Sequence, residues 1–166
     1  HTIKAQPSNR KMFQALAKSG CTLIDYECIK DAQGNRLISF GYFAGIVGAY
    51  NTLRAYMLRY RLGDLKPAHA CYDLAELRAQ FRKVKIKPIK VALTGGGRVA
   101  NGAIEALEQM KIKQVNLYDF LNKPFSFPVF TQVHSEHFHV KKGTQFFDKK
   151  DFYKHPELYE SKFMPI

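Results

Sequence analysis

Three consecutive glycines stand where an apolar run meets a helix-like segment. Residues 91–94 (VALT) precede Gly95-Gly96-Gly97, and residues 98–110 then carry apolar side chains at helical spacing. The pattern Gly95-x-Gly97-x-x-Ala100 matches the G-x-G-x-x-G/A fingerprint of a strand-to-helix turn that binds the pyrophosphate of a dinucleotide. The sequence therefore predicts a dinucleotide-binding turn formed by Gly95, Gly97, Arg98, Val99 and Ala100.

Each position of this turn has a physical reason. Gly95 permits a tight turn, and Gly97 has no Cβ, so a pyrophosphate can approach its backbone. The small Ala100 lets the helix lie close to the strand. The N–H groups and dipole at the helix start favour phosphate, and Arg98 either adds a positive charge or points to solvent. A glycine-rich turn without a ligand is the alternative. The spacing differs from G-x-x-x-x-G-K-[ST], which disfavours a nucleoside-triphosphatase loop.

Asp119 is the candidate for contact with the adenosine ribose. In a βαβ unit, an acidic residue about 20 residues after the glycines binds this sugar. Residues 114–118 (QVNLY) are predicted as the second strand, and Asp119 follows them directly. An N-cap for residues 120–123 is the alternative role. A carboxylate at the ribose would disfavour a 2′-phosphate and favour NAD over NADP, but the sequence leaves this choice open.

Three histidines lie close together in the segment 134–139 (HSEHFH). On a strand, His137 and His139 would share a face, and His134 would need a bend to join them. Zinc sites need three or four convergent ligands with a defined second shell. A polar strand end or loop is the simpler interpretation, so no metal site is predicted.

The rest of the chain alternates helix-like and strand-like segments. Helical spacing predicts helices over residues 7–18, 45–61, 72–82 and 98–110, the last with Val99, Ile104, Leu107 and Met110 on its apolar face. Strand-like runs cover residues 21–29, 36–43, 89–94, 114–118 and 127–133, of which the first two form a hairpin or neighbouring strands. We expect an α/β fold with an incomplete Rossmann-type parallel sheet, preceded by the end of an α/β substrate domain.

Composition excludes several classes of protein. The 166 residues are 46% hydrophobic, which is too apolar for a disordered chain, and no run is long enough to span a bilayer. The net charge of +12 permits nucleic-acid binding. The basic residues are scattered apart from 82–87 and 141–142, however, whereas a nucleic-acid module needs clustered cations with stacking aromatics. That alternative is therefore disfavoured. The aromatic tail, 144–166, is expected to pack in the core or against a domain.

The cysteines bear on the cellular compartment, and the first residue bears on whether the chain is part of a longer polypeptide. Cys21, Cys28 and Cys71 are an odd number without CxxC spacing, which predicts free thiols in a reducing, cytoplasmic compartment. Cys21 and Cys28 lie in an apolar run and are expected to be buried. The chain begins at His1 without an initiator Met or signal peptide, so we expect an excised piece of a longer polypeptide.

Four blocks of sequence, in order, resemble the saccharopine dehydrogenase / lysine–2-oxoglutarate reductase family. They are residues 1–6 (HTIKAQ), 23–27 with 34–45 (LIDYE and GNRLISFGYFAG), 97–103 (GRVANGA) and 155–163 (HPELYESKF). The resemblance spans nearly the whole chain and is weakest at residues 62–90 and 120–143. The wider relatives are alanine dehydrogenase and the proton-translocating transhydrogenases.

The resemblance implies two α/β domains with a cleft between them. Residues 1–43 would end the substrate domain, 44–87 would form an interdomain helix and linker, and 88–166 would begin the dinucleotide-binding domain. The implied reaction interconverts saccharopine with lysine plus 2-oxoglutarate, through an imine and a hydride transfer with NAD or NADP. A second catalytic lysine of the family would precede His1, and further strands would follow Ile166. The fragment alone is therefore expected to be inactive.

The resemblance also assigns site residues. His1 matches the active-site acid/base, and Lys4 matches a basic residue that tunes it. Arg36 matches an arginine that binds a substrate carboxylate, and Phe40 lines the same pocket. A related amino-acid dehydrogenase, such as alanine dehydrogenase, is the alternative enzyme. The expected partners are small amino-acid and 2-oxo-acid substrates and the rest of the parent polypeptide, with no nucleic acid and no membrane, and a homo-oligomer is left open.

Overall fold

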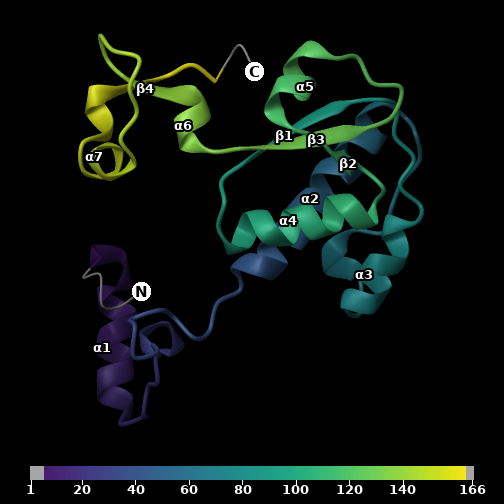
Figure 1. Cartoon of the computed structure of the whole chain (residues 1–166). Coiled ribbons are helices and arrows are strands. Elements are labelled where there is room, and N and C mark those ends of the chain that lie inside the picture. Colours follow the sequence, from purple (N-terminus) through teal and green to yellow (C-terminus); the bar gives the residue numbers. More distant parts are fainter. Residues whose placement is uncertain (1–5, 164–166) are drawn as a thin grey trace. The chain divides into compact units, whose positions relative to one another are not determined.

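The computed structural model describes residues 6–163 and divides the chain into two compact units, His1–Ser39 and Phe40–Ile166 (Figure 1). Whether residues 1–43, 44–87 and 88–166 act as substrate domain, linker and dinucleotide-binding domain stays a prediction. Among the described residues, no helix is long and apolar enough to cross a bilayer.

The first unit is helical and mostly exposed. It contains η2 (Pro7–Asn9), α1 (Arg10–Ser19) and η3 (Tyr26–Cys28). Helix α1 confirms the helix predicted over residues 7–18, and it ends at Gly20, whose positive φ of 66° is the usual glycine conformation after a helix.

The predicted strands 21–29 and 36–43 are wrong. The side chain of Asp25 accepts a hydrogen bond from the N–H of Glu27, which turns the chain into η3 instead of a strand. In the described part of this unit, the strand-like pairing is one isolated antiparallel bridge, Lys30 with Arg36. Cys21 and Cys28 are exposed instead of buried.

The second unit alternates helices and strands. Its elements are α2 (Gly41–Arg59), η4 (Ala68–Ala70), α3 (Leu74–Phe81), β1 (Lys90–Thr94), α4 (Arg98–Gln109), β2 (Lys113–Gln114), α5 (Leu117–Asn122), β3 (Val129–Val133), α6 (Ser135–Phe138), β4 (His139–Lys141), α7 (Lys149–Lys154), η5 (Pro156–Leu158) and β5 (Tyr159–Ser161). Helix α3 begins as predicted, because Asp73 caps it by accepting from the N–H of Glu76.

A three-stranded parallel sheet forms the centre of this unit, in the order β1-β3-β2. Lys90 of β1 and Lys113 of β2 both lie in register with Val129 of β3. The α/β class with a parallel sheet is therefore confirmed. In this order β3, and not β2, lies next to the glycine-bearing strand β1.

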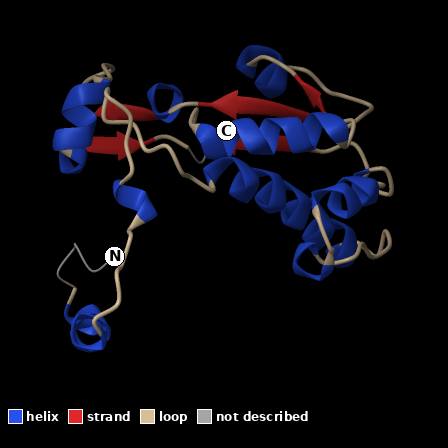
Figure 2. Ribbon diagram, turned by 90° about the horizontal axis from the view of Figure 1, so that it is seen from below, coloured by secondary structure: helices blue, strands red, loops and turns tan. Residues whose placement is uncertain are grey.

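Helices cover both faces of the sheet. Val91, Leu93 and Phe130 face a core that they share with α2 and α4, and these two helices lie side by side on one face (Figure 2). The side chain of Lys90 points to the other face, where its ammonium donates to the carbonyl of Phe120 in α5. Figure 1 shows α5 on the opposite side of the strands from α2 and α4.

Tyr50 is the largest fully buried side chain of this core. Its hydroxyl donates to the carbonyl of Lys66 at 2.6 Å, and its ring packs 5.7 Å from that of Phe81. Burial raises the pKa of Tyr50 to about 12. The loop after α2 is thereby tied to the middle of that helix.

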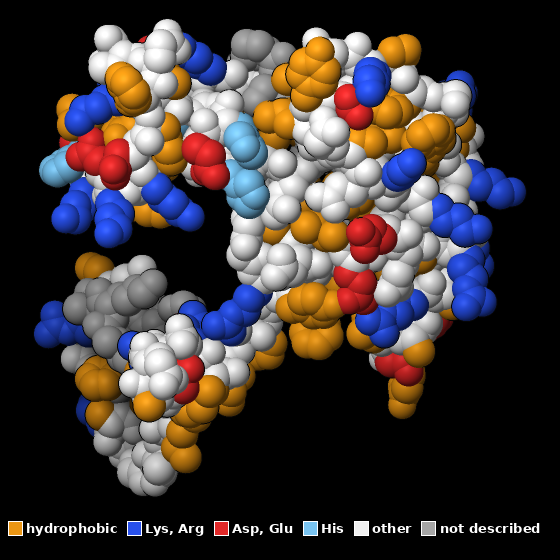
Figure 3. Space-filling model, viewed as in Figure 1, with side chains coloured by type: hydrophobic (Ala, Val, Ile, Leu, Met, Phe, Trp, Pro, Cys, Tyr) orange, Lys and Arg blue, Asp and Glu red, His pale blue; other side chains and the backbone are white. Residues whose placement is uncertain are grey.

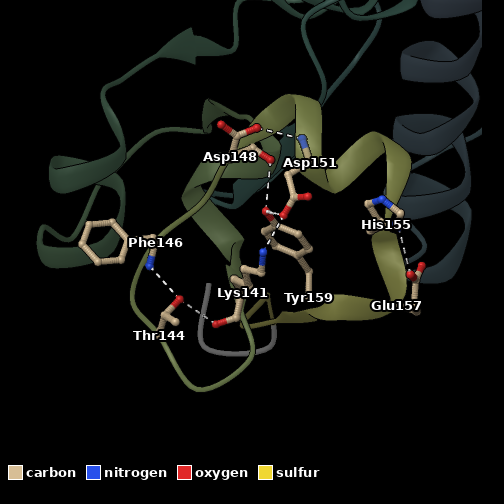
Figure 4. Close-up of polar contacts among 8 residues, drawn as sticks. All are labelled: Lys141, Thr144, Phe146, Asp148, Asp151, His155, Glu157 and Tyr159. Atoms are coloured by element: carbon tan, nitrogen blue, oxygen red, sulfur yellow. Dashed lines mark hydrogen bonds and ion pairs between the residues drawn. The ribbon is translucent and has the colours of Figure 1, made fainter.

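The strands β4 and β5 form a small two-stranded antiparallel sheet, and α7 lies in the segment that connects them (Figure 4). The carboxylate of Asp151 accepts from Lys141 at 2.8 Å and from the hydroxyl of Tyr159 at 2.9 Å. The Lys141 ammonium lowers the pKa of Asp151. Tyr159 is buried here, but Phe146 is 81% exposed, so the predicted packing of the aromatic tail holds only in part.

Candidate dinucleotide-binding site

The glycine turn lies at the carboxyl ends of β1 and β3. Strand β1 ends at Thr94, and Gly95 then adopts a φ of +97°, a backbone conformation that residues other than glycine rarely adopt. The N–H of Gly95 donates to the carbonyl of Val133 at 2.9 Å, and the side-chain amide of Gln132 donates to the Gly95 carbonyl at 2.8 Å. The tight turn expected at Gly95 is confirmed, and β3 holds it in place.

Gly97 is the N-cap of α4 and leaves the start of this helix open. Among residues 6–163, no side chain caps the helix at this end, which is the arrangement found where a helix start binds a phosphate. A Cβ at Gly97 would meet no atom within 4 Å, and the φ of −94° suits any residue. Neither packing nor backbone strain within residues 6–163 therefore requires glycine here, whereas close approach of a phosphate would.

The residues that open α4 divide between surface and core. Arg98 and Val99 are exposed, and Ala100 is only 4% exposed. The prediction that Val99 lies on the buried face of the helix is wrong, because its side chain is 54% exposed. The buried Ala100 agrees with the need for a small residue between helix and strand.

Helix α2 fixes the position of α4 through two glycines. A Cβ at Gly45 would lie 1.9 Å from the carbonyl oxygen of Val99, and a Cβ at Gly102 would lie 1.9 Å from that of Tyr42. The two backbones therefore touch at both points. Because Val99 belongs to the first turn of α4, this contact sets where the open N–H groups of that helix point.

His134 completes the surroundings of the turn. A Cβ at Gly96 would lie 2.7 Å from Cε1 and 3.0 Å from Nδ1 of this histidine, so the ring lies against the bare backbone. The N–H of His134 donates to Nδ1 of His137 at 2.9 Å. Figure 3 shows histidine side chains together on the surface at α6. The sequence assigned neither Gln132 nor His134 to the site, although both lie at the carboxyl end of a strand parallel to β1.

The neighbourhood of Asp119 differs from the sequence prediction. Strand β2 ends at Gln114. The side chain of Asn116 then accepts a hydrogen bond from the N–H of Asp119, and α5 begins at Leu117. Asn116 is therefore the N-cap, and Asp119 forms an ion pair with Lys123 at 2.8 Å. The predicted strand over residues 114–118 is wrong beyond Gln114. The ribose contact of Asp119 stays a prediction, without the support of a strand next to β1.

Sequence comparison relates this chain to proteins of known function. No family model matches the chain. The alpha-aminoadipic semialdehyde synthase, mitochondrial, of Rattus norvegicus is 32% identical over 190 residues, covering 98% of this chain and 20% of the rat protein. The alpha-aminoadipic semialdehyde synthase of Arabidopsis thaliana is 27% identical over 98% of this chain. The saccharopine dehydrogenase [NAD(+), L-lysine-forming] of Neurospora crassa is 25% identical over 72% of it.

The chain is homologous to alpha-aminoadipic semialdehyde synthases and saccharopine dehydrogenases. It spans 20% of the length of the rat synthase and 35% of the length of the Neurospora dehydrogenase. The resemblance seen in the sequence is thereby confirmed.

The substrate residues that this family implies lie away from the glycine turn in sequence. His1 and Lys4 lie outside the described residues. Arg36 forms an ion pair with Glu27, with 3.3 Å between Nη2 and Oε1. The ring of Phe40, at the start of the second unit, is 63% exposed. The roles of all four residues stay predictions.

The histidine segment does not form the strand that was considered for it. His134 precedes α6, which contains His137, and His139 begins β4. Among residues 6–163, no three His, Cys, Asp or Glu side chains come together in a way that could hold a metal ion. His134 contacts the glycine turn, whereas the ring of His139 packs 4.6 Å from that of Phe152.

Proposed function

We propose that the full-length protein is a nicotinamide-dependent oxidoreductase of lysine metabolism, which interconverts saccharopine with lysine plus 2-oxoglutarate. The observation that carries this proposal is homology over 98% of the chain to a protein named alpha-aminoadipic semialdehyde synthase. A shorter relative carries the name saccharopine dehydrogenase and forms L-lysine with NAD(+). The chemistry is an oxidation or reduction at a CH–NH bond.

The glycine turn is the proposed cofactor site. Its open helix start and its accessible Gly97 backbone fit a pyrophosphate, and the exposed Arg98 adds a positive charge beside them. A bound nicotinamide supplies or accepts the hydride. Whether the cofactor is NAD or NADP depends on the group that faces the adenosine ribose.

Arg36 and Phe40 are the proposed substrate contacts within the described residues. A guanidinium binds a carboxylate through two parallel hydrogen bonds, and both saccharopine and 2-oxoglutarate carry such groups. In this structure the guanidinium of Arg36 forms an ion pair with the carboxylate of Glu27. We propose that His1 moves the proton of the imine chemistry and that Lys4 tunes it, since an imidazole titrates near neutral pH.

The cellular setting belongs to the same proposal. We propose a cytoplasmic location, in keeping with the free thiols of Cys21, Cys28 and Cys71. The proposed partners are the small-molecule substrates and the rest of the polypeptide, and a homo-oligomer would be detected by light scattering of the purified protein.

The test is the oxidation of NADH or NADPH by the full-length protein, with lysine and 2-oxoglutarate each omitted in turn. The proposal predicts absorbance loss at 340 nm only when both are present, and saccharopine as the product by mass spectrometry. Turnover with another amine, such as ammonia with pyruvate, would instead indicate an alanine dehydrogenase. An absence of turnover with any of these substrates would contradict the proposed activity.

A further inference from the structure

We propose that His134, and not Asp119, faces the adenosine ribose, and that the site therefore accepts a 2′-phosphate. This inference rests on the proposed binding of a nicotinamide dinucleotide at the glycine turn. It names the residue that determines cofactor specificity, which the sequence pattern had placed elsewhere.

The strand order carries the first step. The fingerprint places the ribose contact at the carboxyl end of the strand that lies next to the glycine-bearing strand. Here that neighbour is β3, whereas β2 lies on the far side of β3. Neighbouring strands are about 4.8 Å apart, so β2 is displaced from β1 by about twice that distance. Asp119 follows β2 and is held in α5 by its contact with Asn116.

The contacts of β3 carry the second step. Val133 is the last residue of β3, and its carbonyl accepts from the N–H of Gly95. His134 follows directly, and its ring lies close enough to Gly96 to leave no room for a Cβ. The residue that follows the neighbouring strand therefore lies against the glycine turn, on the side where the fingerprint places the ribose.

The chemistry of His134 carries the third step. An Asp or Glu at this place would hydrogen-bond the 2′-hydroxyl and repel a 2′-phosphate, whereas an imidazole can donate to either group and can carry positive charge. Nδ1 of His137 accepts from the His134 N–H, so a neutral His137 carries its proton on Nε2 and can also donate. The exposed Arg98 follows the turn and adds a cation.

One carboxylate does lie in this segment and must be separated experimentally. Glu136 is exposed in the first turn of α6, two residues after His134. Of these two residues, the contact with the turn is made by His134. We therefore expect neutralising Glu136 to have little effect on cofactor preference.

The experiment measures dissociation constants of NADPH and NADH for the full-length protein by cofactor fluorescence. The variants are His134→Asp, His134→Asn, Asp119→Asn and Glu136→Gln. Asp and Asn both favour the N-cap position that His134 occupies, so the two His134 variants should keep α6 and the fold, which circular dichroism checks.

The wild type should bind NADPH at least as tightly as NADH. His134→Asp should weaken NADPH by at least about tenfold, because a carboxylate then faces the 2′-phosphate. The same variant should leave NADH within about threefold, and His134→Asn should lose less NADPH affinity than His134→Asp. Asp119→Asn and Glu136→Gln should leave the ratio of the two constants unchanged.

Two results would overturn the assignment while the proposed function stands. One is a wild type that binds NADH but not NADPH. The other is a ratio that responds to Asp119→Asn or Glu136→Gln and not to His134→Asp. A wild type that binds neither cofactor would overturn the proposed function and this assignment together.

Discussion

The crossing of α2 and α4 gives the sharpest mutational prediction. A Cβ at Gly45 would lie 1.9 Å from the Val99 carbonyl oxygen, and 2.8 and 2.9 Å from two further backbone atoms. Ordinary contacts between carbon and a carbonyl oxygen begin near 3.3 Å, so Gly45→Ala must separate the helices by about 1.4 Å. The obstacles are backbone atoms, which no change of rotamer can move.

The expected cost follows from two opposing effects. Overpacking of this severity costs about 3 kcal/mol or more. Alanine in a helix interior is about 1 kcal/mol better than glycine, so the net loss at Gly45 is about 2 kcal/mol. Gly48 lies on the same helix, and a Cβ there meets nothing within 4 Å. Gly48→Ala should therefore stabilise the protein by up to about 1 kcal/mol.

Urea denaturation followed by circular dichroism at 222 nm measures both variants. The difference between them, about 3 kcal/mol, isolates the packing term, because the helix propensity of the new residue is the same at both sites. Gly45→Ala should also weaken cofactor binding, since it displaces the start of α4. Equal stabilities of the two variants would refute the close helix contact and, with it, the reason given for the position of the phosphate-binding turn.

Three further predictions concern the turn and the titrating groups. Gly95→Ala should cost about 1–2 kcal/mol through backbone strain alone, because its φ is +97° but its Cβ meets no atom, and a melting temperature equal to wild type would contradict this. Tyr50 has a pKa raised from 10.0 to about 12, so up to about 2.7 kcal/mol of stability should be lost as pH rises through this interval. Tyr50→Phe should remove that part of the pH dependence, which urea midpoints across the interval would show. The pKa of Asp151 is lowered by Lys141, so the two-stranded sheet of β4 and β5 should lose stability as pH falls below the ordinary value of 3.8. Amide hydrogen exchange should detect this loss in the wild type and not in Asp151→Asn.

The local parts of the fold were predictable because nearby residues determine them. The glycine turn, α4 and α3 depend on a strand end, a positive φ and an N-cap, all of which a short stretch of sequence contains. The same reasoning failed where a polar side chain redirected an apolar run. Asn116 starts α5 inside a segment that resembled a strand, and Asp25 does the same for η3.

The strand order could not be predicted, because pairing joins segments that are far apart in the chain. A local pattern gives β1, α4 and β2 in succession, but it does not show that β3 separates the two strands. The sequence alone therefore offered two interpretations of His134, part of a polar strand end or loop or, less simply, a metal ligand. Its place at the site was accessible in one way, since residues that follow parallel strands share an edge of the sheet with the glycines.

Gly97 offers the most direct test of the central claim that the turn binds a nicotinamide dinucleotide. Its φ of −94° and the empty space around its Cβ position mean that Gly97→Leu should fold normally, while the new side chain would occupy the path of the pyrophosphate. The measurement is the affinity of the full-length protein for NADPH and NADH by fluorescence titration, with Gly48→Ala as the control. We predict loss of binding in Gly97→Leu and unchanged binding in Gly48→Ala. Wild-type affinity in a folded Gly97→Leu protein would contradict the account.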